Sequence, residues 1–388
     1  MMLFNPSFSQ EDVSFILKAE FAYNQEQYND AWLFIDSVKE ANFYSDNIKG
    51  KILLKQNKID KALTQFHKSN KDKEHYSDFD IVMAYAQKKN YDSLTIYLKR
   101  HLTSNYKEMS NVIESNASLN DYRASEYWSK LNLKDFYTKE DEAIERAIFY
   151  KNKKEISLAL DILDDLLINN KSFAEAYYYR AKFIILLNND YKYAIDDLKK
   201  AIKIDKTNPD YLFLIAEFYL HERKYKKALD FYKKANISDP YYLDNYERLA
   251  EANYRMNEYE EAIRNINLFL NVNYRNVDAL KLAGQIYYDK GDYKKSIAYL
   301  TQATYINCRR IDVLVARGKS YLENDEYQRA GMDFNIALDL DSKNGELWYL
   351  KGLAFMYQDK MKQACKYFTK ASYLNYYKAE EYLLKECQ

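Results

Sequence analysis

Residues 284–303 read GQIYYDKGDYKKSIAYLTQA, and the spacing within this stretch returns along residues 192–370. A small side chain recurs at an interval of 34 residues, as Ala194, Ala228, Ala262, Ser296, Ala330 and Ala364. A large side chain lies three positions before each of them, as Tyr191, Tyr225, Tyr259, Tyr293, Tyr327 and Met361. A fixed interval of this length indicates a helical repeat that must stack on copies of itself to bury its apolar face.

Helix geometry explains why the recurring residues are small. In the quoted stretch, Gly284 belongs to a first expected helix, and Ser296, Leu300 and Ala303 have the i, i+4, i+7 spacing of one face of a second helix. Small side chains let two such helices approach closely, while the large neighbours fill the remaining space. The stretch therefore predicts a unit of two packed helices.

The composition fits an all-α chain with balanced charge. Its 388 residues include 58 basic and 58 acidic side chains, which argues against a nucleic acid or an anionic membrane surface as the main partner. Only 7 Gly and 3 Pro occur, so helix breakers are scarce. Four of the glycines fall at the same position of a repeat, where close packing is expected: Gly50, Gly284, Gly318 and Gly352.

These residues resemble the tetratricopeptide repeat family. Its pattern of apolar, small and aromatic positions is present as Leu212, Ile215, Ala216, Tyr219, Ala228, Tyr232, Ala235 and Pro240, and again as Leu314, Gly318, Tyr321, Ala330, Phe334 and Ala337. The resemblance implies a right-handed superhelical solenoid of antiparallel helix pairs, with about eleven repeats and a C-terminal capping helix. It also implies a non-catalytic scaffold or adaptor that binds a protein or peptide on its concave surface.

The repeat pattern varies along the chain and suggests four segments. Residues 10–134 carry irregular repeats, 135–376 carry the regular array, and 377–388 are expected to form the capping helix. The pattern is poorest over 105–136, which is either a diverged helix pair or a joint between two stacks. We favour one continuous stack, because no Gly/Ser or Pro linker marks a hinge there.

The N-terminal residues 1–9 bear on localisation. Ser7 and Ser9 have the spacing of small residues at a signal-peptidase site, which would make this segment a signal-peptide remnant. That interpretation predicts a bacterial periplasmic or cell-envelope protein. The alternative is a disordered arm of a cytoplasmic protein.

The cysteines bear on the same question. If the helices around Cys365 and Cys387 run antiparallel, the two sulfur atoms reach the same level and can form a disulfide that fastens the end of the array. A similar pair closes some envelope-exported bacterial repeat proteins. In the cytoplasm both would instead be reduced thiols. Cys308 has no partner of the kind that nucleophilic catalysis requires.

No arrangement of residues predicts catalysis. The four histidines do not pair at metal-ligand spacing, and phosphate-loop and nucleophile-elbow motifs are absent from the sequence. We therefore predict no enzyme activity, no metal and no cofactor, and we do not expect a small-molecule ligand. One acidic residue recurs near the start of each first helix and either caps that helix or attracts a basic partner: Glu175, Asp210, Asp244, Asp278, Asp312 and Glu346.

The resemblance also assigns groove positions. Among the positions mapped onto this sequence, the candidate partner contacts are Phe213, Tyr254, Tyr288, Tyr349, Leu353, Met356 and Tyr357. The last four are the preferred hot spot, with packing against the end helix as the alternative. The function expected from all this is a scaffold in a cell-envelope assembly. The alternative is a cytosolic cochaperone-like or regulatory module that binds peptides, although the Lys and Asn clamp of chaperone-binding relatives does not recur here.

Overall fold

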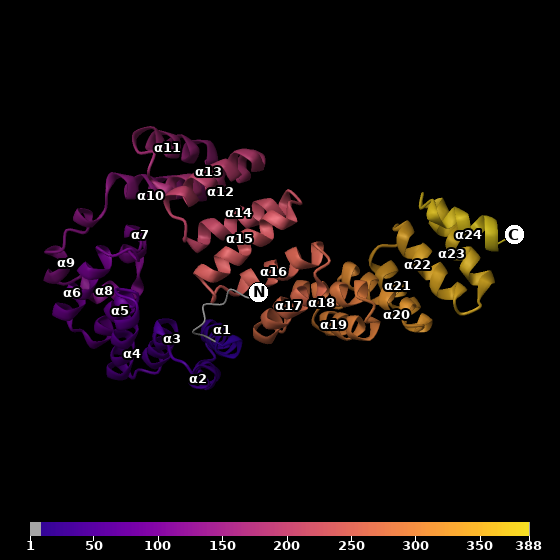
Figure 1. Ribbon diagram of the computed structural model, residues 1–388, viewed down its shortest axis with the longest axis horizontal. Helices are drawn as coiled ribbons and strands as arrows, with labels where there is room; N and C mark the ends of the chain where they lie inside the picture. Colours follow the sequence, from indigo (N-terminus) through magenta and orange to yellow (C-terminus); the bar gives the residue numbers. More distant parts are fainter. Residues whose placement is uncertain (1–8, 388) are drawn as a thin grey trace. The chain divides into compact units, whose positions relative to one another are not determined.

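The computed structural model describes residues 9–387, and every regular element in that range is helical (Figure 1). It contains 24 α-helices, two 3-10 helices and no strand within the described range. Helices follow one another as packed pairs, eleven in number when the short helices of residues 110–136 are taken together as one diverged pair, and α24 covers the end. The predicted all-α solenoid of paired helices is therefore confirmed.

The first part of the chain has pairs of unequal length. Its helices are α1 Gln10–Asn24, α2 Tyr28–Asp36, α3 Phe43–Lys55, α4 Ile59–Asp72, α5 Asp78–Lys88 and α6 Tyr91–Leu102. Short helices follow as α7 Ser110–Ser115, η1 Ala117–Leu119, α8 Asn120–Arg123, α9 Glu126–Ser129 and η2 Leu133–Phe136. Ile113, Leu119 and Tyr122 from this short-helix region are buried in one cluster with Leu94 and Leu98 of α6. The region thus keeps the core position of a repeat although its helices are broken.

The later helices are nearly uniform in length. They are α10 Lys139–Asn152, α11 Ile156–Asn169, α12 Ala174–Asn188, α13 Tyr191–Ile204, α14 Pro209–His221, α15 Tyr225–Ser238, α16 Leu243–Arg255 and α17 Tyr259–Val272. They continue as α18 Val277–Asp289, α19 Tyr293–Ile306, α20 Ile311–Glu323, α21 Tyr327–Leu340, α22 Gly345–Met356, α23 Met361–Tyr373 and α24 Lys378–Glu386.

Local sequence fixes where these helices begin. The side chains of Asn208, Asn276 and Asn344 accept hydrogen bonds from backbone N–H groups of the first turns of α14, α18 and α22, which otherwise lack a partner. Within each repeat other than the diverged pair of residues 110–136, a residue with positive φ, such as Arg223 (56°) or Gly291 (84°), lies two positions before the second helix. One left-handed residue therefore makes each tight turn between paired helices.

Glycine sets the distance between the helices of a pair. A Cβ atom built on Gly318 of α20 would lie 2.4 Å from the ring of Phe334 on α21, and one on Gly352 would lie 2.5 Å from Phe368. Both rings are fully buried. The predicted close-packing role of these glycines is therefore visible as an aromatic ring lying directly on helix backbone.

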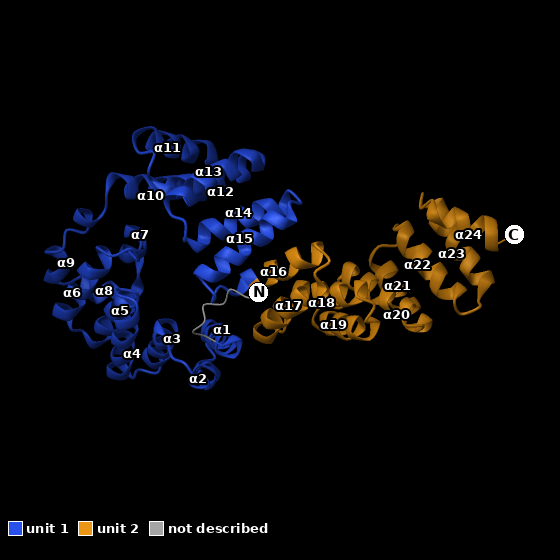
Figure 2. Cartoon of the chain, in the orientation of Figure 1, with its two compact units in different colours: residues 1–245 blue, residues 246–388 orange. Residues whose placement is uncertain are grey.

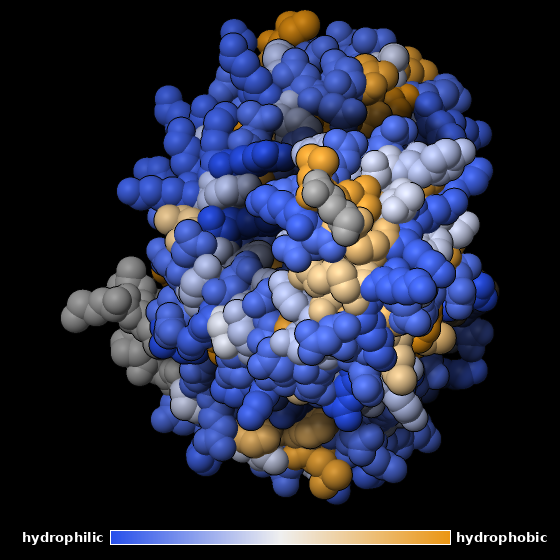
Figure 3. Space-filling model, turned by 90° about the vertical axis from the view of Figure 1, so that its right-hand side faces the viewer, coloured by the Kyte–Doolittle hydropathy of each residue, from blue (hydrophilic) through white to orange (hydrophobic). Residues whose placement is uncertain are grey.

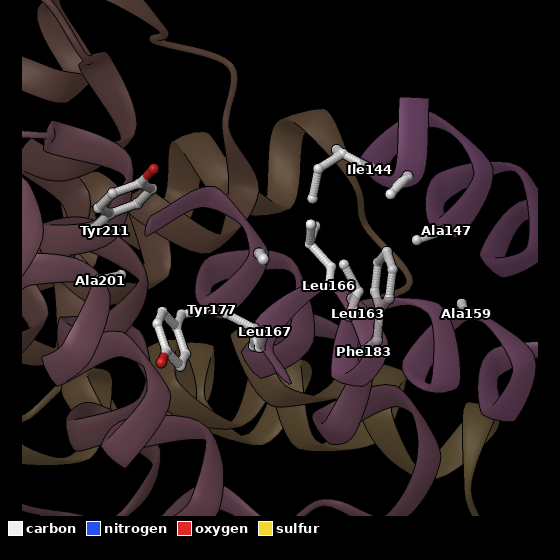
Figure 4. Packing of buried hydrophobic residues seen from close by; sticks show 12 residues of the cluster. Ile144, Ala147, Ala159, Leu163, Leu166, Leu167, Tyr177, Phe183, Ala201 and Tyr211 are labelled. Carbon is white, nitrogen blue, oxygen red and sulfur yellow. The ribbon is translucent and has the colours of Figure 1, made fainter. Parts of the chain in front are cut away.

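Alternation of small and large side chains continues in the cores (Figure 4). In the cluster formed by α10–α14, Ala147, Ala159 and Ala201 are fully buried beside Leu163 and Phe183. Such interdigitation is what brings protein interiors to crystal-like packing density. Each repeat thus buries its apolar face partly within itself and partly on its neighbour.

The chain divides into two compact units, residues 1–245 and 246–388, with the boundary inside α16 (Figure 2). The change of regularity that the sequence shows near residue 134 lies within unit 1, and the segment limits drawn from it stay predictions. Residues 1–8 and 388 lie outside the described range, so the signal-peptide interpretation of residues 1–9 falls almost entirely outside it. No helix among the described residues is long and apolar enough to cross a bilayer.

Candidate protein-binding groove

Three first helices, α16, α18 and α20, together with Leu300 of α19, line a pocket of about 240 Å³ in unit 2, which we call the α18–α20 pocket. Its lining residues are Tyr254, Gly284, Gln285, Tyr288, Asp289, Leu300, Asp312, Val315, Ala316, Lys319 and Ser320. Two of the predicted groove residues, Tyr254 and Tyr288, are brought together here from neighbouring repeats. The pocket mixes aromatic and aliphatic walls with a few polar groups, as ligand sites commonly do.

Small residues create the floor of this pocket. Gly284 leaves room for Leu300, whose Cγ would be 2.5 Å from an added Cβ. Ser320 Oγ donates to the Ala316 carbonyl at 2.9 Å, so it accepts from Ser296 Oγ at 2.8 Å. Both serines are fully buried, and their hydroxyl groups satisfy one another instead of facing the pocket. The floor is therefore closed and rigid.

The rim of the pocket is made of tyrosine and charged side chains that join neighbouring repeats. Tyr254 donates to Asp289 at 2.6 Å, which leaves its ring facing the pocket edge. Burial raises the pKa of Tyr288 to about 12, with the nearby Glu323 carboxylate as a further cause. Tyr288 is therefore protonated at neutral pH, and its hydroxyl donates a hydrogen bond to Glu323.

Part of the predicted acidic row is neutralised by basic side chains. Arg310 donates to Asp278 and Asp312 at 2.8 Å, and Lys281 donates to Asp312 at 2.8 Å. The Arg310 guanidinium holds the pKa of Asp312 well below its ordinary value, and Lys281 contributes to this shift. In the next repeat Lys319 donates to Glu346 at 2.9 Å. These carboxylates connect first helices to one another, so they do not form a free acidic wall.

The other predicted groove residues lie elsewhere. Phe213 belongs to unit 1, where its ring meets those of Tyr232 and Tyr242 at centroid distances of 5.6 and 4.9 Å. It therefore does not line the α18–α20 pocket.

The four C-terminal groove candidates, Tyr349, Leu353, Met356 and Tyr357, lie in α22 or directly after it. Tyr349 meets the rings of Tyr376 and Tyr382 at 5.2 and 5.6 Å, and Leu353 and Met356 pack in the same cluster as Tyr382 of α24. Only Tyr357 remains 47% exposed. The chain's own capping helix thus contacts Tyr349, and a partner-binding role for these residues stays a prediction.

The two C-terminal cysteines are joined in the structure. A disulfide links Cys365 on α23 to Cys387, which directly follows α24, with 5.6 Å between their Cα atoms. Cys308, in the turn before α20, is a free and exposed thiol. The disulfide fastens the capping helix α24 to the last helix pair. It therefore also supports the contact between Tyr349 and Tyr382 of α24.

Several lining residues were not singled out from sequence. Leu300, Ser320 and Ala316 follow the repeat pattern of core positions, and nothing in that pattern distinguishes a core residue that also borders a pocket.

Within residues 9–387 no group of His, Cys, Asp and Glu side chains is arranged to hold a metal ion. Viewed from its C-terminal side, the surface is mainly hydrophilic, with apolar side chains in separate small groups (Figure 3).

Comparisons with known proteins agree with the repeat. The family model described as "Anaphase-promoting complex, cyclosome, subunit 3" matches residues 188–269, and models described as "Tetratricopeptide repeat" match residues 247–307 and 345–377. None of the curated proteins matches the chain.

Several solved structures of repeat proteins are similar to the chain at low sequence identity. The C-terminal part of a TPR repeat-containing protein from Cytophaga hutchinsonii is similar with a TM-score of 0.50 and 14% identity, covering 60% of this chain and 95% of that one. A tetratricopeptide repeat protein from Parabacteroides merdae has a TM-score of 0.48 and 18% identity, covering 64% of this chain and 99% of that one. YrrB, described as a TPR protein with an unusual peptide-binding site, has a TM-score of 0.41 and 20% identity, covering 46% of this chain and 91% of that one.

Proposed function

We propose that the chain, whose residues 247–307 and 345–377 match tetratricopeptide repeat models, is a non-catalytic scaffold that binds a protein or peptide partner through the α18–α20 pocket. The observation that carries the proposal is the pocket itself, where Tyr254 and Tyr288 from successive repeats flank the aliphatic Val315. Its volume of about 240 Å³ suits one or two side chains of an extended segment. Tyrosine anchors of this kind dominate the binding energy of many protein interfaces.

The polar rim gives the proposed site its selectivity. The Gln285 amide can donate a hydrogen bond to a peptide backbone or accept one from it. Since Asp312 and Lys319 are each paired with a neighbouring side chain, the rim has little net charge to offer. We therefore expect a partner segment that inserts an apolar or aromatic side chain and hydrogen-bonds around it.

A photo-crosslinking amino acid at position 288 tests this proposal in the native cell. We expect it to capture a partner, and we expect the Tyr254→Ala/Tyr288→Ala variant to lose at least about tenfold in affinity for that partner. The matched control is Tyr305→Ala on α19, since Tyr305 is 92% exposed and lies outside the pocket lining. Equal affinity of the wild type and the Tyr254→Ala/Tyr288→Ala variant, with helical content unchanged, would exclude the pocket.

We further propose that this scaffold works in the bacterial cell envelope. The paired Cys365 and Cys387 support that location, since structural disulfides persist in oxidising compartments. Mass spectrometry of protein alkylated in intact cells is expected to find Cys308 alkylated, Cys365 and Cys387 protected, and the mature chain starting near Gln10. Free thiols at all three positions would place the protein in a reducing compartment instead.

A further inference from the structure

In unit 1, the beginning of α3 touches the turn after α15, although 199 residues separate the contacting side chains. Asn42 Nδ2 donates to Tyr241 Oη at 2.9 Å in a buried hydrogen bond. The ring of Tyr241 also stacks on that of Tyr44, with 4.3 Å between centroids and 22° between planes. The helix packing of unit 1 otherwise joins mainly neighbours along the chain, so this contact connects its first repeats to its last.

The groups on the α3 side of this contact are held in position by hydrogen bonds that do not involve Tyr241. Asn42 is the N-cap of α3, and its Oδ1 accepts from the backbone N–H groups of Tyr44 and Ser45 at 2.9 Å. That use of the oxygen directs the amide nitrogen away from the helix, toward Tyr241. Tyr44 in turn donates from its hydroxyl to Glu20 on α1 at 2.8 Å, which fixes its ring.

The turn that carries Tyr241 is equally defined. Tyr241 N–H donates to Asp239 Oδ1 at 2.9 Å, and Pro240 between them restricts the backbone. Tyr241 is only 5% exposed, so its side chain is committed to this contact. The Tyr241 ring, held by its turn, therefore meets the Asn42 amide and the Tyr44 ring, which are held by α3 and α1.

Electrostatics oppose the contact. Burial raises the pKa of Glu20 and of Asp239, and each carboxyl lies on the surface where the two segments meet. The Asp239 carboxylate further raises the pKa of Glu20, whereas Lys73, whose ammonium lies 4.6 Å from the Phe43 ring, favours the charged form of Asp239. The hydrogen bond and the ring stack lie beside two half-buried carboxyls that repel one another, and a contact of this kind is suited to opening and closing.

We propose that Asn42, Tyr44 and Tyr241 form a clasp that holds unit 1 closed on itself, and that unit 1 opens when Tyr241 leaves Tyr44. In the closed state Asn42 and Tyr44, at the start of α3, contact the chain's own tyrosine. Opening exposes the Tyr44 ring and the Asn42 amide. The clasp is a property of unit 1 and does not depend on the pocket proposed for unit 2.

Distance measurement between spin labels tests the clasp directly. Labels on Leu33→Cys in α2 and Ile237→Cys in α15 use side chains that are 65% and 50% exposed, in a Cys308→Ser background that keeps the Cys365–Cys387 disulfide. We expect a single narrow distance distribution for the otherwise wild-type chain. Tyr241→Ala is expected to shift it to longer distances and broaden it.

Matched variants separate the clasp from general destabilisation. Tyr274→Ala removes a 65% exposed tyrosine from the turn one repeat later and is expected to leave the distribution unchanged. Tyr241→Phe keeps the ring but loses the hydrogen bond, and it is expected to broaden the distribution even if Tyr241→Ala does not fold. A broad distribution in the wild type, or one that stays narrow in every folded Tyr241 variant, overturns the proposal.

Discussion

A single histidine shows how one buried side chain can make stability depend on pH. His101 on α6 is 2% exposed, its ring stacks on Phe79 with 4.9 Å between centroids, and its Nε2 accepts from the Glu108 backbone N–H at 3.2 Å. The neutral ring then carries its proton on Nδ1, which has no hydrogen-bond partner among the described residues. Burial lowers the pKa of His101 to about 4, although Asp78 works in the opposite direction.

We predict that α6 loses stability as the pH falls from about 6.5 toward 4. In that window the unfolded chain binds a proton at His101 and the folded chain does not, so protonation favours unfolding, by up to roughly 3 kcal/mol at its lower end. His101→Gln keeps an acceptor for Glu108 and removes the titration. The protection factors of the α6 amides, which correct for the intrinsic exchange rate at each pH, should therefore fall less from pH 7 to pH 5 in this variant than in the wild type. The same fall in both would assign the pH effect to other groups.

At the scale of the helix, the decisive contact is an aromatic ring on glycine. Gly318 and Gly352 each lie under a phenylalanine of the following helix, so the two helices of a pair approach to the distance that backbone and ring allow. Gly331 on α21 differs, since a Cβ atom there would have no neighbour closer than 3.8 Å. The same residue type therefore has two different roles within one repeat.

We predict that Gly318→Ala destabilises unit 2 by about 1–3 kcal/mol, because the added methyl group must displace the buried Phe334 ring. Gly331→Ala is the control and should be neutral or stabilising by up to about 1 kcal/mol, since alanine favours the helix. Urea denaturation of both variants measures the difference. Equal effects at the two positions would mean that the helix pair can adjust its spacing.

For the whole molecule, the end of the array is secured by covalent and aromatic contacts together. Tyr382 of α24 packs on Tyr349 and Phe368, and the Cys365–Cys387 disulfide closes a loop of sequence separation 22 around that helix. A loop of this size is worth roughly 3 kcal/mol by the chain-entropy argument. The cap therefore depends on the redox state of its surroundings.

We predict that Cys387→Ser increases hydrogen exchange in α24 and α22, and that a reducing agent does the same to the wild type. Cys308→Ser should leave both helices unchanged, because Cys308 is exposed and unbonded. If reduction leaves the exchange of α24 unaltered, the aromatic contacts alone hold the cap.

How much of this could be predicted from sequence depends on the range of each contact. The 34-residue interval predicted the helix pairs, and the family resemblance assigned Tyr254 and Tyr288 to the groove, where the structure brings them to one pocket. These contacts lie within a repeat or between adjacent repeats, so a periodic sequence records them.

Other features leave no periodic signal. The meeting of Asn42 with Tyr241 depends on the summed small rotations of all the intervening helix pairs, and no local pattern records that sum. The buried carboxylates Asp197 and Asp333 are held by Arg180 and Arg317, but charged residues are so frequent in this chain that such pairs could not be recognised beforehand. The covering of Tyr349 by α24 likewise required coordinates.

The disulfide at the end of the array has a mechanical consequence. In a stack, each pair of helices packs mainly on its neighbours. A force applied to the two termini is therefore expected to unfold the pairs one after another. The disulfide between Cys365 and Cys387 prevents the segment between them from being extended by the force. Under tension, the fully extended chain would therefore be shorter in an oxidising medium, where the disulfide is intact, than in a reducing one.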